Sequence, residues 1–298
     1  MFRKGQADTH KMEISFGCPD MIDVLQAIIL GIVQGLTEWL PISSSGHLAI
    51  LQLAMGLEVP IFFDLILHIG TLTGVIAIYK RDIVSILSSI SAFLRLYLHL
   101  GNQQHLHRYP INKSDLELIK LLILGMIPTA AIGILFKSFF EYSFYDTNAI
   151  VLGFIVTGIL VLATKFLKSG NKKLGNTDAL FIGIGQGLSI FSSISRSGIT
   201  LSIGMLRGLK KDNLVKYSFL LSIPAILGAS IFDIVGADKD TITQMYAIPL
   251  TSYVAGTLLS AIIGYASIKF LIRVINNESF YLFSFYCFAI GLVTFLFL

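Results

Sequence analysis

Apolar runs of about 20 residues recur along this chain from Met21 to Leu298. An α-helix rises about 1.5 Å per residue, so a run of this length crosses the roughly 30 Å of hydrocarbon in a bilayer. The charged fraction agrees, because 13% of the residues are Asp, Glu, Lys or Arg, against about 25% in an ordinary soluble domain. We therefore predict a polytopic all-α membrane protein and exclude a soluble globular fold.

A single membrane domain is predicted over residues 21–298, because no polar linker long enough to separate two folded bodies interrupts the chain. Residues 1–20 form a polar tail of mixed charge without the apolar core of a signal peptide, and Met21 is a second candidate for the native start. Cys18 and Cys287 fit neither a disulfide framework nor a metal site. The net charge of +4 does not indicate nucleic-acid binding, since basic residues in a membrane protein report orientation first.

An internal repeat divides the membrane domain. Residues 31–48 align without gaps on residues 183–200, and nine of the aligned positions are identical, among them Gln34 with Gln186 and Ser43 with Ser195. We interpret the chain as a tandem duplication, with repeat one over about residues 21–167 and repeat two over about residues 179–298.

Both repeat cores contain an apolar stretch that small and polar residues interrupt, at 41–46 and at 192–198. Non-helical backbone at membrane depth is tolerated only where it is buried in protein or lines a wet cavity. Each interruption therefore predicts a re-entrant helix-loop-helix hairpin. The remaining apolar runs predict about six transmembrane helices, three in each repeat, at 61–95 as one long helix, 117–136, 149–167, 214–236, 247–272 and 279–298.

An odd number of spans between the hairpins places them on opposite sides of the membrane, which predicts an inverted-topology repeat. Splitting residues 61–100 into two helices would destroy this inversion. The loops assigned to one side are rich in Lys and Arg, whereas loops 137–147 and 236–244 are neutral or acidic. By the positive-inside rule the basic side is cytoplasmic, so both termini and the mouth of the first hairpin are predicted outside.

Polar residues gather at the first interruption: Gln34, Glu38, Ser43, Ser44, Ser45 and His47. Gln34 and Glu38 are four residues apart and so share a helix face. An ionisable group in a membrane segment indicates a functional site, because burying it without a partner costs several kcal/mol. The alternative is that Glu38 only caps or pins the break.

The second interruption contributes a cation flanked by hydroxyls: Ser195, Arg196, Ser197 and Thr200. The planar guanidinium matches a phosphate or carboxylate bidentately, and helix N-termini rich in Ser and Gly offer N–H donors to the same anion. The alternative is an internal ion pair between Arg196 and Glu38 that stabilises the interface between the repeats.

If the repeats are inverted, the two loops meet near the midplane and assemble groups suited to phosphoryl transfer. Arg196 would neutralise developing charge, and Ser43 or Ser44 would attack phosphorus or orient a water. Glu38 and His47 would manage protons. Asp64 and His68 also share a helix face; we predict either contacts that support this site or an ordinary interhelical hydrogen bond.

The string QGLTEWLPISSSGHL, its partner SISRSGIT and the stretches FDLILHIGT, LLILGMIP and FLLSIP closely resemble the undecaprenyl-diphosphatase family, also called the bacitracin-resistance protein family. The resemblance covers nearly the whole chain. It implies an integral phosphatase of the plasma membrane that removes the terminal phosphate of a polyprenyl diphosphate. This reaction regenerates the lipid carrier for cell-envelope glycans, at a site thought to open to the extracytoplasmic side.

Carried over residue by residue, the resemblance implies Glu38, Ser44, His47 and Arg196 as catalytic residues. It implies a divalent cation, Mg²⁺ or Ca²⁺, with Glu38 as a ligand, and a substrate-binding set of Gln34, Ser43, Ser45, Ser195, Ser197 and Thr200. The sequence departs from the family pattern in two respects. Gln34 replaces a Glu, which removes one negative charge from the expected metal ligands. Residues 192–197 lack the usual Pro and Gly, which leaves the loop geometry and the preferred carrier, undecaprenyl or dolichyl, open.

A lipid-phosphate transporter or flippase that uses the same midplane site is the alternative function, because inverted repeats with broken helices are a transporter architecture. A phosphatase releases inorganic phosphate in detergent, whereas a pure transporter needs a sealed vesicle. The partners we expect are a polyprenyl diphosphate, membrane lipids and, as an open hypothesis, a second copy of the chain in a homodimer, but no nucleic acid.

Overall fold

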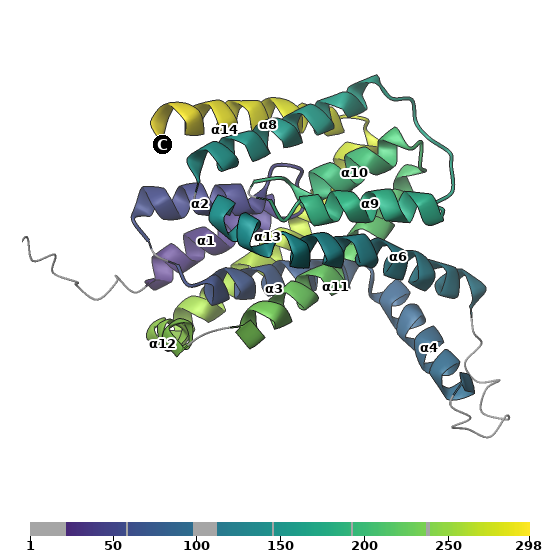
Figure 1. The fold of residues 1–298 in the computed structure, drawn as a ribbon, viewed down its shortest axis with the longest axis horizontal. Helices are drawn as coiled ribbons and strands as arrows, with labels where there is room; N and C mark the ends of the chain where they lie inside the picture. Colours follow the sequence, from purple (N-terminus) through teal and green to yellow (C-terminus); the bar gives the residue numbers. More distant parts are fainter. Residues whose placement is uncertain (1–21, 58, 98–111, 145, 192, 237–238) are drawn as a thin grey trace, which may run out of the picture.

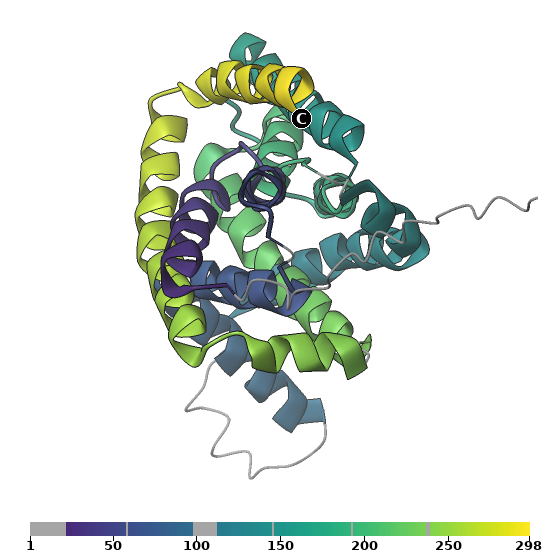
Figure 2. The ribbon, with the colours of Figure 1, turned by 90° about the vertical axis from the view of Figure 1, so that its left-hand side faces the viewer.

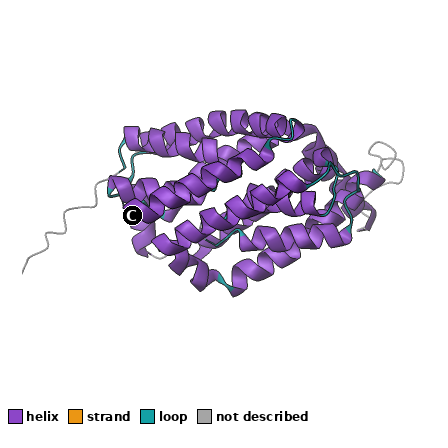
Figure 3. Ribbon diagram, turned by 90° about the horizontal axis from the view of Figure 1, so that it is seen from above, coloured by secondary structure: helices purple, strands orange, loops and turns teal. Residues whose placement is uncertain are grey.

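A computed structural model describes residues 22–57, 59–97, 112–144, 146–191, 193–236 and 239–298. The predicted tail at 1–20, Cys18 and the candidate start at Met21 lie outside this range. Apart from one isolated bridge between Lys172 and Leu209, every regular element of the described part is helical (Figure 3). The elements are α1 (Val24–Thr37), α2 (Ser44–Met55), α3 (Ile61–Ile78), α4 (Lys80–Tyr97), α6 (Lys113–Leu135), α7 (Lys137–Phe144), α8 (Thr147–Ala163), η1 (Thr164–Phe166), α9 (Asn176–Leu188), α10 (Arg196–Leu206), α11 (Lys211–Gly236), α12 (Lys239–Ala247), α13 (Leu250–Asn276), η2 (Phe280–Leu282) and α14 (Phe283–Phe297).

Among the described residues, five helical segments are long and apolar enough to cross a bilayer, which makes this a multi-pass membrane protein. Large apolar side chains on them are exposed, Val235 by 81% and Leu135 by 77%, as helices that face lipid require. Allowing for shifts at their ends, these segments confirm five of the six predicted spans: Lys113–Leu135, Thr147–Phe166, Lys211–Gly236, Leu250–Asn276 and Phe280–Phe297.

The predicted single helix over residues 61–95 is wrong. α3 and α4 meet at an angle of 86°, and the break falls at Tyr79, directly before the charged run 80–82. Side chains of α4 are held by polar partners: Lys216 pairs with Asp82, and Ser85 Oγ donates to Asp115 Oδ2 at 2.5 Å. These polar contacts stabilise α4 as a separate helix that leaves the bundle (Figure 1).

The two halves of the chain pack against each other reciprocally. α1 of the first half lies along α13, and α9 of the second half lies along α6. Gly31 and Gly183 permit these approaches, because a Cβ at either position would collide with the backbone carbonyl of Gly256 or Gly125, respectively. Viewed along the bundle, α13 and α14 form part of the rim, and α1 and α2 lie inside it (Figure 2).

The tips of the α1–α2 and α9–α10 pairs carry matching helix caps. Ser43 Oγ accepts a hydrogen bond from the Gly46 N–H at 3.2 Å, and Ser195 Oγ accepts one from the Gly198 N–H at 3.1 Å. A serine at this position satisfies one of the N–H groups that a helix N-terminus leaves free. The aligned residues of the two repeats therefore have the same local function.

The two tips contact each other inside the bundle. Residues 38–43, which join α1 to α2, are all buried, as non-helical backbone in a membrane protein must be. Ser197 Oγ donates to the Leu40 carbonyl oxygen at 3.0 Å. Trp39 packs edge-on against Phe219 of α11, with ring centroids 5.3 Å apart. Polar and apolar contacts together therefore hold the first tip in place.

Candidate active site

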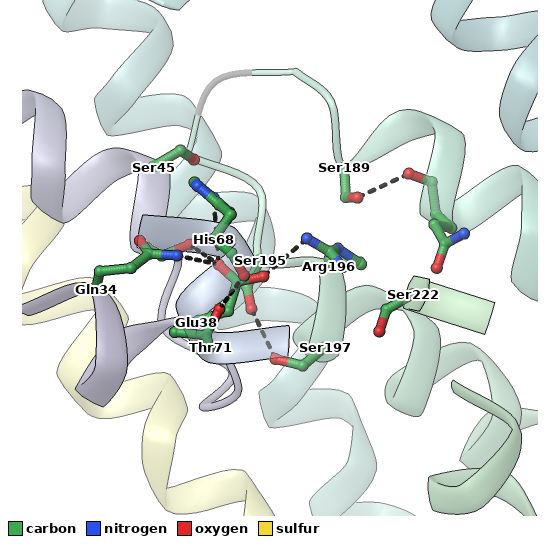
Figure 4. Close-up of polar contacts among 12 residues, drawn as sticks. Gln34, Glu38, Ser45, His68, Thr71, Ser189, Ser195, Arg196, Ser197 and Ser222 are labelled. Atoms are coloured by element: carbon green, nitrogen blue, oxygen red, sulfur yellow. Dashed lines mark hydrogen bonds and ion pairs between the residues drawn. The ribbon is translucent and has the colours of Figure 1, made fainter. Parts of the chain in front are cut away.

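Glu38, where α1 ends, is the centre of a buried polar cluster (Figure 4). Its side chain is 2% exposed. Oε1 accepts a hydrogen bond from Arg196 Nη2 at 2.8 Å, and Oε2 accepts one from Ser44 Oγ at 2.7 Å and one from Gln34 Nε2 at 3.0 Å. A carboxylate this deeply buried requires such donors. Four of the predicted site residues, which lie on both hairpins, are thus in direct contact.

The ion pair between Arg196 and Glu38, which was the alternative interpretation of Arg196, is present. It involves only one of the two terminal nitrogens of the guanidinium. Arg196 Nη1 is buried and has no hydrogen-bond partner among the described residues, and the same holds for Gln34 Oε1. Folded proteins leave few buried polar atoms unpaired. Arg196 Nη1 is therefore an unpaired donor on the same side chain that binds Glu38, and a guanidinium nitrogen is suited to bind a phosphate oxygen.

Ser44 combines a hydroxyl with a helix N-terminus. Its Oγ donates to Glu38, which places a base in contact with a hydroxyl that can act as a nucleophile. α2 begins at Ser44 and α10 begins at Arg196. The two helix N-termini, each with partial positive charge, therefore lie at the cluster, where they favour an anion.

His68 of α3 is the imidazole beside Glu38. Its Nε2 lies 3.4 Å from Glu38 Oε2, and its Nδ1 lies 2.7 Å from the carbonyl oxygen of Asp64. A carbonyl oxygen only accepts, so Nδ1 carries a hydrogen. The imidazole therefore turns Nε2 toward the carboxylate of Glu38. We predicted His68 only as a supporting residue.

His47 points elsewhere. Its Nδ1 lies 2.6 Å from the Ser43 carbonyl oxygen, and its Nε2 lies 2.8 Å from the Tyr286 hydroxyl of α14, whose ring stacks on the imidazole. The structure therefore does not bring His47 against Glu38, as the predicted proton-handling pair would need. His47 nevertheless lies one turn from Ser44 on α2.

The hydroxyls predicted to bind the diphosphate have partners within the protein. Ser43 Oγ lies 3.3 Å from Ser45 Oγ, and the equivalent pair Ser195 and Ser197 lies at 3.2 Å. Thr200 Oγ1 donates to the Arg196 carbonyl oxygen at 2.8 Å. These hydrogen bonds stabilise the N-termini of α2 and α10, and the role of the hydroxyls toward a substrate stays a prediction.

The donor set does not fit a resident metal ion. Within the described ranges no group of three or more His, Cys, Asp or Glu side chains is placed to hold one. The carboxylate oxygens of Glu38 already accept from Arg196, Ser44 and Gln34. Asp64 instead accepts from Gln52 Nε2, at 3.0 Å to each oxygen. Mg²⁺ is commonly bound by one or two carboxylates together with substrate phosphates, so a cation at this cluster would need the substrate for most of its ligands.

Sequence reasoning missed Gln52 and Tyr286. Helical spacing relates Asp64 to His68 on one face, but no spacing indicates that Gln52 of α2 reaches Asp64. Tyr286 is 239 residues from His47 in the chain. Neither contact has a local signal, and only the packed bundle reveals them.

Fold and site together define a class: a multi-pass helical membrane protein with a buried carboxylate, guanidinium, hydroxyl and imidazole in one cluster. Comparison with known proteins gives the family. A family model described as Bacitracin resistance protein BacA matches residues 27–293, and this chain belongs to that family.

Proteins named undecaprenyl-diphosphatase are similar to this chain over nearly their whole length. The protein of Methanosphaera stadtmanae is 39% identical, over 92% of this chain and 98% of its own. That of Carboxydothermus hydrogenoformans is 38% identical, over 89% and 94%. That of Korarchaeum cryptofilum is 35% identical, over 91% and 98%. These matches confirm the resemblance inferred from the sequence.

Proposed function

We propose that this chain is an integral membrane phosphatase that hydrolyses undecaprenyl diphosphate to undecaprenyl phosphate and inorganic phosphate. The similar proteins are named for this activity. The observation that carries the proposal concerns the two terminal nitrogens of the Arg196 guanidinium. Nη2 binds Glu38. Nη1 is buried and unpaired within the described part, so it is available to a phosphate oxygen. The product is a lipid carrier that cell-envelope glycan synthesis can use again.

The attacking oxygen comes from Ser44 or from a water that Ser44 orients. Glu38 accepts the proton as this oxygen bonds to the terminal phosphorus. The bond from that phosphorus to the bridging oxygen breaks, and undecaprenyl phosphate leaves with the electron pair. On the serine route, a water then hydrolyses the phosphoserine, so both routes consume one water.

Arg196 and the helix N-termini of α2 and α10 stabilise negative charge on the terminal phosphate as the bond breaks. His68 Nε2 lies 3.4 Å from Glu38 Oε2 and helps to position the carboxylate, whose negative charge Arg196 balances. His47, beside Ser44 and held by Tyr286, lies where the diphosphate would enter, and we retain it as a substrate-contacting group.

A divalent cation is proposed as a companion of the substrate. Mg²⁺ or Ca²⁺ would be held mainly by the diphosphate, and Glu38, whose oxygens already accept hydrogen bonds from Arg196, Ser44 and Gln34, would offer it one further contact. Gln34 in place of a carboxylate makes this contact weak, because it contributes no negative charge. We therefore expect activity to depend on the concentration of the cation rather than on a tightly held ion.

We propose that the two halves form an inverted-topology pair. The reciprocal packing of α1 on α13 and α9 on α6 supports this arrangement. The bend at Tyr79 is compatible with it if α3 alone crosses and α4 stays at the basic end, so that each half keeps three spans. By the positive-inside rule that end is cytoplasmic and the site opens outside. A homodimer in the plasma membrane is a further prediction, which light scattering of the purified protein tests.

Phosphate release from undecaprenyl diphosphate by the purified protein in neutral detergent tests the activity, with and without Mg²⁺. Release without a sealed compartment is the expected result, since hydrolysis needs no gradient. Transport of the lipid in sealed vesicles with no phosphate release in detergent would contradict the proposal and favour the flippase alternative.

A further inference from the structure

A second polar pocket lies where α8 ends and α14 begins, and it shares no residue with the Glu38 cluster. We call it the α8–α14 pocket. It is an open hollow with a cavity volume of about 90 Å³. Its polar side chains come from three parts of the chain that are distant in sequence: Thr164, Lys165, Lys168, Ser169, Lys211, Glu278 and Tyr281.

The helices around this pocket indicate its position relative to the membrane. The span Thr147–Phe166 ends at the pocket, and the spans Lys211–Gly236 and Phe280–Phe297 begin there. The ends of membrane spans lie at the level of the lipid headgroups. Phe166 is 78% exposed and Leu282 is 52% exposed, so apolar side chains suited to acyl chains flank the polar lining.

The lining carries an excess of positive charge. Lys165 lies over the Tyr281 ring, with Nζ 5.3 Å from the centroid, and in the described part of the chain neither Lys165 nor Lys168 pairs with a carboxylate. Lys211 Nζ lies 3.0 Å from Glu278 Oε1, but the Glu278 side chain is 69% exposed. An exposed ion pair of this kind contributes little free energy, so an anionic ligand can compete for Lys211.

We propose that the α8–α14 pocket binds a phosphate group, and specifically the headgroup phosphate of an anionic membrane lipid. Three lysines around one hollow attract a phosphate, and basic pockets between helix ends at headgroup depth are suited to anionic lipids. Free inorganic phosphate also offers negatively charged oxygens to the lysines, but it would gain nothing from the exposed Phe166 and Leu282. This site is independent of the proposed phosphatase activity.

Native mass spectrometry of the full-length protein in neutral detergent tests the site by titration with phosphatidylglycerol or phosphatidylcholine. The pocket variant carries Lys165→Gln and Lys168→Gln. Its matched control carries Lys80→Gln and Lys113→Gln, which remove the same charge from two exposed lysines outside the pocket. A third variant, Glu278→Gln, removes the carboxylate that competes for Lys211. Thermal unfolding of each protein with and without inorganic phosphate forms a separate arm.

The parent should bind phosphatidylglycerol in preference to phosphatidylcholine, and the pocket variant should bind it about tenfold more weakly. The control should match the parent, and E278Q should bind more tightly. If lipid selectivity is absent but inorganic phosphate raises the unfolding temperature of the parent and not of the pocket variant, the phosphate site stands with a soluble ligand. An equal loss in the control, or no effect of either phosphate source, would overturn the proposal.

Discussion

The guanidinium of Arg196 donates to Glu38 at 2.8 Å across 158 residues of chain. This contact joins the tips of two hairpins that come from opposite halves of the duplication. One guanidinium nitrogen thus holds the carboxylate, and the other has no hydrogen-bond partner in the described part of the chain. Under the proposed function, the ion pair is part of the site as well as a contact between the halves.

Glu38 and Ser44 should act as a unit. Glu38→Gln removes the base, and Ser44→Ala removes the hydroxyl that donates to it at 2.7 Å. We expect each single variant to lose about 100-fold or more in kcat, and the double variant to lose little beyond the worse single one. Phosphate release by the four proteins measures this cycle. Ser138→Ala, at an exposed serine of α7, is the control, and additive losses would show that the two residues act separately.

His68 should position Glu38 for the reaction. His68→Gln keeps a polar side chain but removes the imidazole that lies 3.4 Å from Glu38 Oε2. We expect kcat to fall by about tenfold with little change in KM, because the carboxylate acts in the chemical step. His47→Gln should instead raise KM with little change in kcat, since His47 contacts Tyr286 and not Glu38. Steady-state phosphate release measures both constants, and an unchanged kcat for H68Q would exclude the positioning role.

Close packing between the halves should be sensitive to one methyl group. Gly183→Ala places a Cβ against the carbonyl of Gly125, and we expect a loss of about 1–3 kcal/mol in stability. Gly228→Ala is the matched control, because no atom lies within 4 Å of the added Cβ. Thermal unfolding in detergent compares them. Equal unfolding temperatures for G183A and G228A would mean that α6 and α9 separate without cost.

The proposed orientation predicts which loops water-soluble reagents reach. Ser138→Cys on α7 should react with a membrane-impermeant maleimide in intact cells, whereas Asn171→Cys, in the loop after η1, should react only after permeabilisation. Both side chains are exposed, so access depends on the side of the membrane. A Cys18→Ser background removes one native thiol, and Cys287 is buried. Labelling of both positions in intact cells would refute the orientation.

The repeat was the strongest guide that the sequence offered to the site. Identical residues at aligned positions predicted two equivalent breaks, and the caps formed by Ser43 and Ser195 are indeed equivalent. The same alignment placed Arg196 opposite Ser44, so both could be named as site residues before their contacts with Glu38 were visible. Motif and repetition therefore located the groups on the chain.

Geometry between distant segments could not be predicted in the same way. Hydrophobicity is continuous enough over residues 61–95 to suggest one helix, and the bend at Tyr79 depends on polar contacts that α4 makes with Lys216 and Asp115. Similarly, His47 was favoured over His68 because it lies near Glu38 in sequence. The bundle reverses this order, since α3 packs close enough to bring His68 against the carboxylate.

The role of the Arg196 guanidinium is tested most directly by measuring phosphate release. The variants are Arg196→Ala, Arg196→Lys and, as a control at an exposed site, Arg273→Ala. With undecaprenyl diphosphate in detergent, R196A should fall by about 100-fold or more in kcat, as removal of a donor to developing charge does. R196K should recover only part of this loss, because an ammonium cannot bind Glu38 and a phosphate oxygen as a planar fork does. R273A should match the parent. Folded R196A that releases phosphate at the rate of the parent would contradict the assignment of Arg196 to the reacting phosphate.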